Sequence, residues 1–225
     1  CPSNRVQNGR FGAVMMMDAK STADCVSAML DSATIPITVK HRTGVDESDS
    51  YEFMRDFVGT IADKGCQTFL VHARKAWLSG LSPKENRTLP TLNYERVYRL
   101  KKDFPNLEII INGGISSIEE SLHHLEKTDG VMMGREAYTN PYILSTVDRD
   151  VYQSTLEPKP RRKIVEEYLP FIEHELANGV KLHRLTRHIL GLFHGMPMAK
   201  AFRRHISENA HKPDADISLI TEALK

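Results

Sequence analysis

Apolar residues recur along the chain with two different periods. A short run rich in β-branched residues at 35–42 is followed by a segment at 49–65 in which apolar residues recur at helical spacing. The same order returns three times, with short runs at 67–74, 107–113 and 130–136 and helical patterns near 93–103, 118–127 and from about 140 onward. A further helical pattern at about 19–32 precedes the first run. This alternation predicts a parallel sheet with crossover helices.

The pattern changes after residue 150, where the short β-branched runs stop. A PKPRRK segment at 158–163 is typical of a linker. Helical patterns follow near 161–178, 181–194, 197–210 and 214–224, separated by Gly179, Gly195, Pro197 and Pro213. We therefore expect an α/β domain at 1–152 and a small all-helical domain at 153–225.

Polar residues cluster where the predicted strands end. The carboxyl ends of parallel strands line the active face of a (β/α)8 barrel, and they also line the crevice of an open α/β sheet. Four strand–helix units make half of a barrel, which usually needs about 250 residues. Half a barrel leaves unpaired edge strands and an uncovered core. We expect either a piece of a longer protein or an assembly that supplies the other half.

Composition narrows the class of protein. The 225 residues carry a net charge of +1, and the three cysteines, Cys1, Cys25 and Cys66, are too few and scattered for a disulfide framework or a zinc site. We expect Cys25 and Cys66 to be small buried apolar residues. The longest apolar runs are far shorter than the ~20 residues of a membrane span, and no signal segment opens the chain. These features predict a cytoplasmic protein without a metal or a membrane partner.

The strand ends offer groups that bind anions. Lys40 and His72 each end a predicted strand, where a lysine can hold an anionic oxygen and a histidine can donate to a cofactor or move a proton. Taken alone, Lys40 is equally well explained as a solvated lysine, and for His72 a purely structural role is the more common case. The sharper signal is the pair INGGI (111–115) and GVMMGREAYTNP (130–141), which fits the phosphate site that barrels build after their last two strands.

Two regions are rich in positive charge. The long loop after the second strand holds Arg74, Lys84 and Arg87 near Trp77, and basic groups beside an exposed aromatic ring suit nucleic acid. The segment from residue 181 to 212 contains seven lysines and arginines but only one acidic residue, Glu208. Within it, Lys200, Arg203 and Arg204 recur at helical spacing. A solvated surface explains such runs in many proteins, but this imbalance favours contact with nucleic acid.

Cys1 opens the chain in a loop that would follow a strand, CPSNRVQNGRFGA. It would lie on the same face as the other strand ends. A thiol near cationic groups can exist as thiolate or serve as a general acid.

These segments together resemble the flavin-dependent tRNA-dihydrouridine synthases. CPSNRVQNGRFGA is similar to the catalytic loop of that family and VKHRTG to its flavin lysine segment, while VHARKAWLSGLSPKENR is typical of the A-type bacterial branch. INGGI, GVMMGREAYTNP, LTRHILGLFHGMP and KAFRRHISENAH extend the resemblance over essentially the whole chain.

The resemblance implies a barrel that binds FMN, takes hydride from NADPH and reduces the C5–C6 bond of a D-loop uridine at tRNA positions 20/20a. Flavin N5 would deliver hydride to C6, and Cys1 would protonate C5 as general acid. The positions that match the FMN residues of the family are Lys40, His72, Asn112, Gly113, Gly114, Gly134 and Arg135. The positions that match its tRNA contacts are Arg74, Lys84, Arg87, Lys200 and Arg203.

The resemblance also implies four further strands before Cys1. We therefore expect an N-terminally truncated barrel, and we predict that these 225 residues alone bind FMN poorly and do not turn over. Two alternatives stay open: an FMN-barrel oxidoreductase that acts on a small molecule, and a non-catalytic tRNA-binding fragment.

Overall fold

The computed structural model describes residues 4–224 of the protein, and the chain folds into two compact units. The first unit comprises residues 1–115 and 119–133, and the second comprises residues 116–118 and 134–225. The predicted boundary at 152/153 differs from this division, which groups residues 134–152 with the C-terminal helices. Each unit is described by itself.

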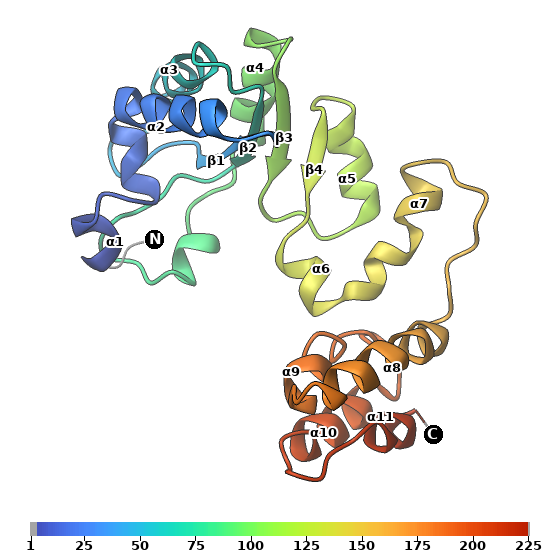
Figure 1. The fold of residues 1–225 in the computed structure, drawn as a ribbon. Coiled ribbons are helices and arrows are strands. Elements are labelled where there is room, and N and C mark those ends of the chain that lie inside the picture. The colour runs from blue at the N-terminus through green and yellow to red at the C-terminus, as the bar shows by residue number, and fades with distance from the viewer. Residues whose placement is uncertain (1–3, 225) are drawn as a thin grey trace. The chain divides into compact units, whose positions relative to one another are not determined.

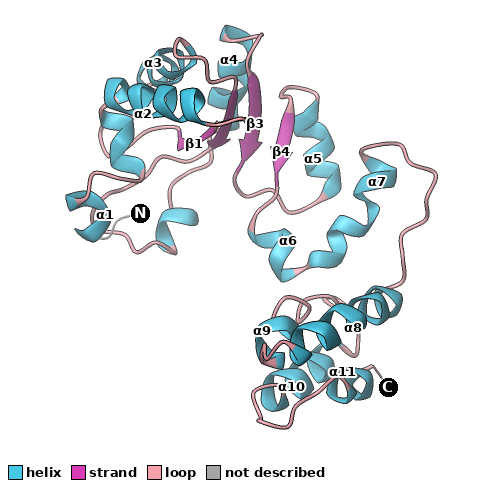
Figure 2. Cartoon of the chain, viewed as in Figure 1, coloured by secondary structure: helices cyan, strands magenta, loops and turns pink. Residues whose placement is uncertain are grey.

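The first unit is built on a four-stranded parallel sheet in the order β1-β2-β3-β4 (Figure 2). The strands are β1 (Thr38–Arg42), β2 (Thr68–His72), β3 (Glu108–Asn112) and β4 (Gly130–Met132). Each strand lies within a predicted run, so the parallel α/β prediction is confirmed for these residues. The fourth strand is the shortest, because the chain enters a helix at Arg135.

Helices connect the strands as the periodicity predicts, with two short elements before the first predicted helix (Figure 1). The helical elements up to β4 are α1 (Asn4–Asn8), η1 (Ala13–Met17), α2 (Ala19–Ser32), α3 (Tyr51–Ala62), η2 (Glu85–Arg87), α4 (Tyr94–Asp103) and α5 (Ile118–Leu125). Side chains of Asp18, Ser50 and Asn93 accept hydrogen bonds from the first-turn backbone of α2, α3 and α4. These caps fix where each helix begins.

The two faces of the sheet differ in burial. Residues of β2 and β3 alternate between fully buried side chains, such as Phe69 and Ile109, and half-buried ones, such as Leu70 and Ile110. The buried set packs in one core with Met54, Phe57 and Ile61 of α3 and with Val97 and Leu100 of α4. The other face is incompletely covered, which is the pattern of a sheet with helices on one side only.

Strand register assigns the polar strand-end residues to a face. Lys40, Leu70 and Ile110 are register partners. Arg42, His72 and Asn112, two residues further along each strand, are register partners too. Residues two apart in a strand share a face. Lys40, Arg42, His72 and Asn112 therefore all belong to the incompletely covered face.

The two described cysteines of the first unit differ in burial. Cys66, in the loop after α3, is buried as expected, but the expectation that Cys25 is buried is wrong, because Cys25 lies on the exposed side of α2, away from the buried Ala23. The Met15–Met17 run forms η1, in which only Met16 is buried in the core.

The second unit contains helices and loops, and its described residues form no strand. Its helical elements are α6 (Arg135–Thr139), η3 (Pro141–Thr146), α7 (Val147–Asp150), α8 (Arg161–Ala177), α9 (Leu182–Thr186), α10 (Ala199–Asn209) and α11 (Ser218–Ala223). A core that includes Val165, Ile172, Phe202 and Ile220 joins α8, α10 and α11. The unit therefore has an apolar interior of its own.

The predicted helix at 181–194 is wrong in its second half. Only Leu182–Thr186 is helical, and turns follow it. A Cβ added at Gly191 would collide with the Thr139 carbonyl oxygen. The chain passes too close to another backbone segment there for a side chain.

Candidate functional site

A cationic and amide cluster lies on the incompletely covered face of the sheet, where β1, β2 and β3 end. Lys40 of β1 donates from Nζ to Oδ1 of Asn112 on β3, at 3.2 Å. Neighbouring strands are about 4.8 Å apart, so this bond passes over the intervening strand β2. The structure thus brings together Lys40 and Asn112, two of the residues that sequence analysis singled out.

The amide of Asn112 has a fixed orientation. Its Nδ2 donates to the Met132 carbonyl oxygen of β4 at 2.7 Å, which leaves Oδ1 to accept from Lys40. Lys40 is an exposed residue, and partial desolvation of its ammonium group and the nearby charge of Arg42 lower its pKa below the usual value. The cluster therefore presents a solvent-accessible lysine that can bind an anionic or electron-rich partner.

The glycine pair after β3 is shaped by its neighbours. Gly113 and Gly114 have φ angles of +119° and +77°, which other residues rarely adopt. A Cβ on Gly113 would lie 2.6 Å from Cδ2 of His72 and 3.1 Å from Cδ2 of Leu92. The ring of His72 therefore packs against the backbone at Gly113, so His72 and the glycine pair belong to one site.

Gly134 and Arg135 belong to the second unit. Gly134 precedes α6 with φ −106°, and a Cβ on it would meet no atom within 4 Å. Neither its backbone conformation nor its packing within the described residues explains the glycine. Arg135 is exposed at the start of this five-residue helix.

The long loop after β2 is an ordered structure held by its own polar groups. Asn86 is buried and bonds both backbone groups of Trp77, accepting from its N–H and donating to its carbonyl, each at 2.8 Å. Arg42 donates to the carbonyls of Lys75 and Asn86 at 3.2 and 2.9 Å. Burial, with the charges of Arg74 and Arg87, lowers the pKa of Arg42 to about 10. This loop is anchored to the end of β1.

Trp77 was expected to be an exposed aromatic residue, and it is instead half-buried. The Nζ of Lys75 lies 4.0 Å from the centre of its ring, a cation–π contact. The ring is therefore already engaged by its own loop.

The three predicted tRNA contacts in this loop differ in their surroundings. Lys84 and Arg87 are exposed. Arg74 is half-buried, and its guanidinium donates to the carbonyls of Thr88 and Pro90. The geometry gives Arg74 a role in holding the loop, whereas Lys84 and Arg87 face solvent.

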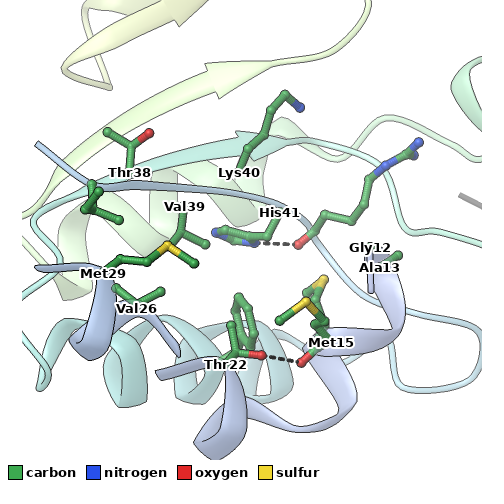
Figure 3. A pocket seen from close by; sticks show the side chains of 14 residues that line it. Gly12, Ala13, Met15, Thr22, Val26, Met29, Thr38, Val39, Lys40 and His41 are labelled. Carbon is green, nitrogen blue, oxygen red and sulfur yellow. Dashed lines mark hydrogen bonds between the residues drawn. The ribbon is translucent and has the colours of Figure 1, made fainter. Parts of the chain in front are cut away.

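A cavity of about 460 Å³ lies beside β1, the edge strand of the sheet (Figure 3). Its walls combine Lys40, His41 and Arg42 of β1 with apolar side chains of η1 and α2, among them Met15 and Val26. His41 is buried against Phe57 and Phe69, and burial lowers its pKa to about 4. The imidazole is therefore neutral at physiological pH, with Nδ1 against the Arg42 carbonyl at 2.7 Å.

The basic residues of the second unit lie at its surface. Lys200, Arg203 and Arg204 are all exposed on α10, while Phe202 and Ile206 of the same helix are buried. The predicted sharing of one solvent-facing side by these three charges is consistent with the helix. Arg184 and Arg187 are also exposed, with Arg187 beyond the end of α9.

Three sequence predictions concern the general acid, a membrane span and a metal site. Cys1, the predicted general acid, lies outside the described residues. Among residues 4–224, no helix has the length and apolar character needed to cross a membrane. The same residues contain no cluster of three or more His, Cys, Asp or Glu side chains that could hold a metal ion.

Sequence analysis missed two residues that shape the site. Arg42 is not among the candidate site residues predicted from the sequence, but it anchors the long loop. Tyr94, at the start of α4, donates its hydroxyl to the Gly113 carbonyl at 2.7 Å. Its position at the first turn of the helix after that loop was the only available signal.

Comparisons with known proteins agree on one family. The family model described as dihydrouridine synthase matches residues 1–225. Proteins named tRNA-dihydrouridine(20/20a) synthase from Vibrio vulnificus, Yersinia pestis and Escherichia coli K12 are 58%, 57% and 56% identical to the chain over its whole length. The chain covers 69%, 65% and 66% of those proteins, so it spans about two thirds of their length.

Proposed function

We propose, from the fact that the chain belongs to the dihydrouridine synthase family, that it serves the reduction of uridine to 5,6-dihydrouridine in the D-loop of tRNA. The modified positions would be 20 and 20a, as in the names of its relatives. The resemblance found from the sequence alone led to the same family.

The hydrogen bond between Lys40 and Asn112 carries the proposal. It joins two strand ends on the open face of a parallel sheet, beside His72 and a glycine pair. Ligands of α/β proteins bind at this end of the strands. A solvent-accessible lysine, an oriented amide and a backbone free of side chains suit a planar ring with hydrogen-bond acceptors that carries an anionic tail.

The donor set fits FMN as the cofactor, and from the resemblance to the family we propose NADPH as its reductant. FMN, when bound, supplies the hydride for the uridine. Lys40 and Asn112 would orient the ring system, and His72 would pack beside it. Gly113 and Gly114 would donate backbone N–H groups to the phosphate, and the match of Gly134 and Arg135 to the family motif assigns these two residues to FMN as well.

Cys1 would hold the proton for C5 of the uracil. Its sulfur lies outside the described residues, so this role rests on the similarity of CPSNRVQNGRFGA to the catalytic loop of the family. A thiol can act as general acid at neutral pH because its ordinary pKa is about 8.5.

The tRNA would contact exposed basic residues. Lys84 and Arg87 on the long loop and Lys200 and Arg203 on α10 all face solvent, as phosphate-binding side chains must. Arg74 would contribute through its hold on the loop as much as through direct contact. The target base would leave its stack to reach the site.

The first 152 residues would form the C-terminal half of a (β/α)8 barrel, and residues 153–225 an all-helical tRNA-binding domain in the cytoplasm. The other half of the barrel would come from the third of the relatives' length that the chain does not cover. The free edge of β1 and the cavity beside it would receive that part. We propose that the 225 residues alone bind FMN poorly and are inactive.

The test is a chimaera in which the unmatched part of the Vibrio vulnificus relative precedes residues 1–225. It is assayed with FMN, NADPH and unmodified tRNA, and dihydrouridine is measured by mass spectrometry. We expect dihydrouridine from the chimaera, none after Cys1→Ala, and none from the 225 residues alone.

Three results would contradict parts of this proposal. Full activity of Cys1→Ala would remove the general-acid role. Tight, salt-sensitive tRNA binding without any dihydrouridine would favour a non-catalytic tRNA-binding protein. Flavin reduction by NADPH without tRNA affinity would favour an oxidoreductase that acts on a small molecule.

A further inference from the structure

The glycine pair after β3 is held from the helix side by one hydroxyl group. Tyr94, the first residue of α4, donates to the carbonyl oxygen of Gly113 at 2.7 Å. The same hydroxyl oxygen would be 3.0 Å from a Cβ on Gly114, so it lies against both glycines. Burial and the nearby charge of Glu120 raise the pKa of Tyr94 to about 12, so the hydroxyl keeps its proton at neutral pH.

Fixing this carbonyl also fixes the next amide. The chain contains no cis peptide bond among its described residues, and the C=O and N–H groups of a planar trans peptide point in opposite directions. Because Tyr94 holds the Gly113 carbonyl toward α4, the N–H of Gly114 points away from that helix. This N–H donates to no other described residue, and Gly114 is exposed.

Tyr94 is itself held by a buried polar contact between α4 and α5. Its ring packs edge-on against His124 with 4.5 Å between ring centres. His124 is 2% exposed, and its Nδ1 lies 2.7 Å from the Tyr98 hydroxyl, one turn along α4. Glu120 of α5 lies on the other side of His124, with 4.0 Å between Oε1 and Nε2. The aromatic ring therefore has little freedom to turn.

We propose that Tyr94 is a positioning residue for the phosphate site: its hydroxyl turns the Gly113–Gly114 peptide so that the Gly114 N–H faces a bound phosphate monoester. This inference rests on the proposed function, which places the phosphate of FMN at the glycine pair. It adds a residue that lies on the helix side of the loop. Without the hydroxyl, the peptide would be free to rotate and the donor would be lost for part of the time.

The matched variants are Tyr94→Phe and Tyr98→Phe. Each removes one hydroxyl from the same helix and keeps the ring, but only the first removes the contact with Gly113. The ¹⁵N-labelled chimaera is titrated with FMN and with riboflavin, which lacks the phosphate, and the Gly114 amide is followed by NMR. Melting temperature reports the general effect of each substitution on the fold.

We expect FMN to shift the Gly114 amide of the unaltered chimaera and riboflavin at the same concentration to leave it in place. Tyr94→Phe should raise the dissociation constant for FMN about fivefold, the worth of one ordinary hydrogen bond, and Tyr98→Phe should change it less than twofold. Riboflavin affinity should not respond to either substitution.

The inference is overturned if the Gly114 amide of the unaltered chimaera ignores FMN, or if both variants weaken FMN binding equally. Its failure can be told from failure of the proposed function. Dihydrouridine formation by the chimaera together with a Gly114 amide that ignores FMN would reject only the role of Tyr94. A Gly114 amide that responds to FMN, in a chimaera that never forms dihydrouridine, would reject only the proposed reaction.

Discussion

Replacing Gly113 with alanine should destabilise the first unit strongly, because two independent costs meet at this position. The backbone has φ +119°, which residues with a Cβ rarely adopt. The new methyl group would also lie 2.6 Å from the His72 ring and 3.1 Å from Leu92. Neither neighbour can move freely, since His72 ends the central strand β2 and Leu92 packs against the core.

The two costs can be given rough sizes. An unfavourable backbone conformation costs about 1–3 kcal/mol, and forcing a methyl group into a packed site costs about as much again. We therefore expect Gly113→Ala to lower the free energy of unfolding of this unit by about 3 kcal/mol. Gly80→Ala is the matched control: its φ is +80°, but no atom lies within 4 Å of the added Cβ. It should show the backbone cost alone, about 1 kcal/mol.

The assay is urea denaturation followed by tryptophan fluorescence. Trp77 is the single tryptophan of the sequence and belongs to the first unit, so the signal reports that unit. Equal losses for Gly113→Ala and Gly80→Ala, or a loss below about 0.5 kcal/mol for Gly113→Ala, would refute the packing of His72 against the glycine pair.

Three further predictions follow from single contacts. Burial lowers the pKa of His41 to about 4, so as the pH falls the unfolded chain binds a proton at this histidine before the folded chain does. The free energy of unfolding should therefore decrease by up to about 3 kcal/mol as the pH drops from 6.5 to 4. Urea denaturation at several pH values should show this decrease, and His41→Leu should remove it. Gly59→Ala should stabilise α3 by up to about 1 kcal/mol in the same assay, since its Cβ would meet only Phe104, at an ordinary 3.5 Å; a net loss would contradict this geometry. In the chimaera, Lys84→Ala should weaken tRNA binding and reduce its salt dependence by about one ion without altering the melting temperature. Arg74→Ala should instead lower the melting temperature, because Arg74 bonds to carbonyl groups of the loop. The reverse pattern would contradict the surroundings assigned to the two residues.

Much of the first unit follows from local pattern. The strand-and-helix alternation located all four strands, because period-two and helical spacing are properties of a single segment. The meeting of Lys40 and Asn112 follows from one more fact, that parallel strand ends share an edge. Burial of Cys25 was wrong because helical position, not residue type, decides which side of α2 faces solvent.

Contacts between distant segments could not be predicted. The carbonyl partners of Arg42 and Arg74 are backbone atoms, which leave no trace in residue identity. Arg74 therefore had the pattern of a nucleic-acid surface although it holds the loop together. The hydroxyl of Tyr94 meets Gly113 only because α4 returns to the end of β3. The close approach of Gly191 to the Thr139 backbone is likewise a contact between distant segments.

The central claim is that the open strand-end face with Lys40 and Asn112 holds the flavin during reduction of tRNA. The most direct test is FMN affinity and dihydrouridine formation in the chimaera with Lys40→Met, compared with exposed Lys20→Met on α2 as the control. The account predicts weaker FMN binding and loss of dihydrouridine for Lys40→Met only. Unchanged FMN affinity and unchanged dihydrouridine in Lys40→Met would contradict it.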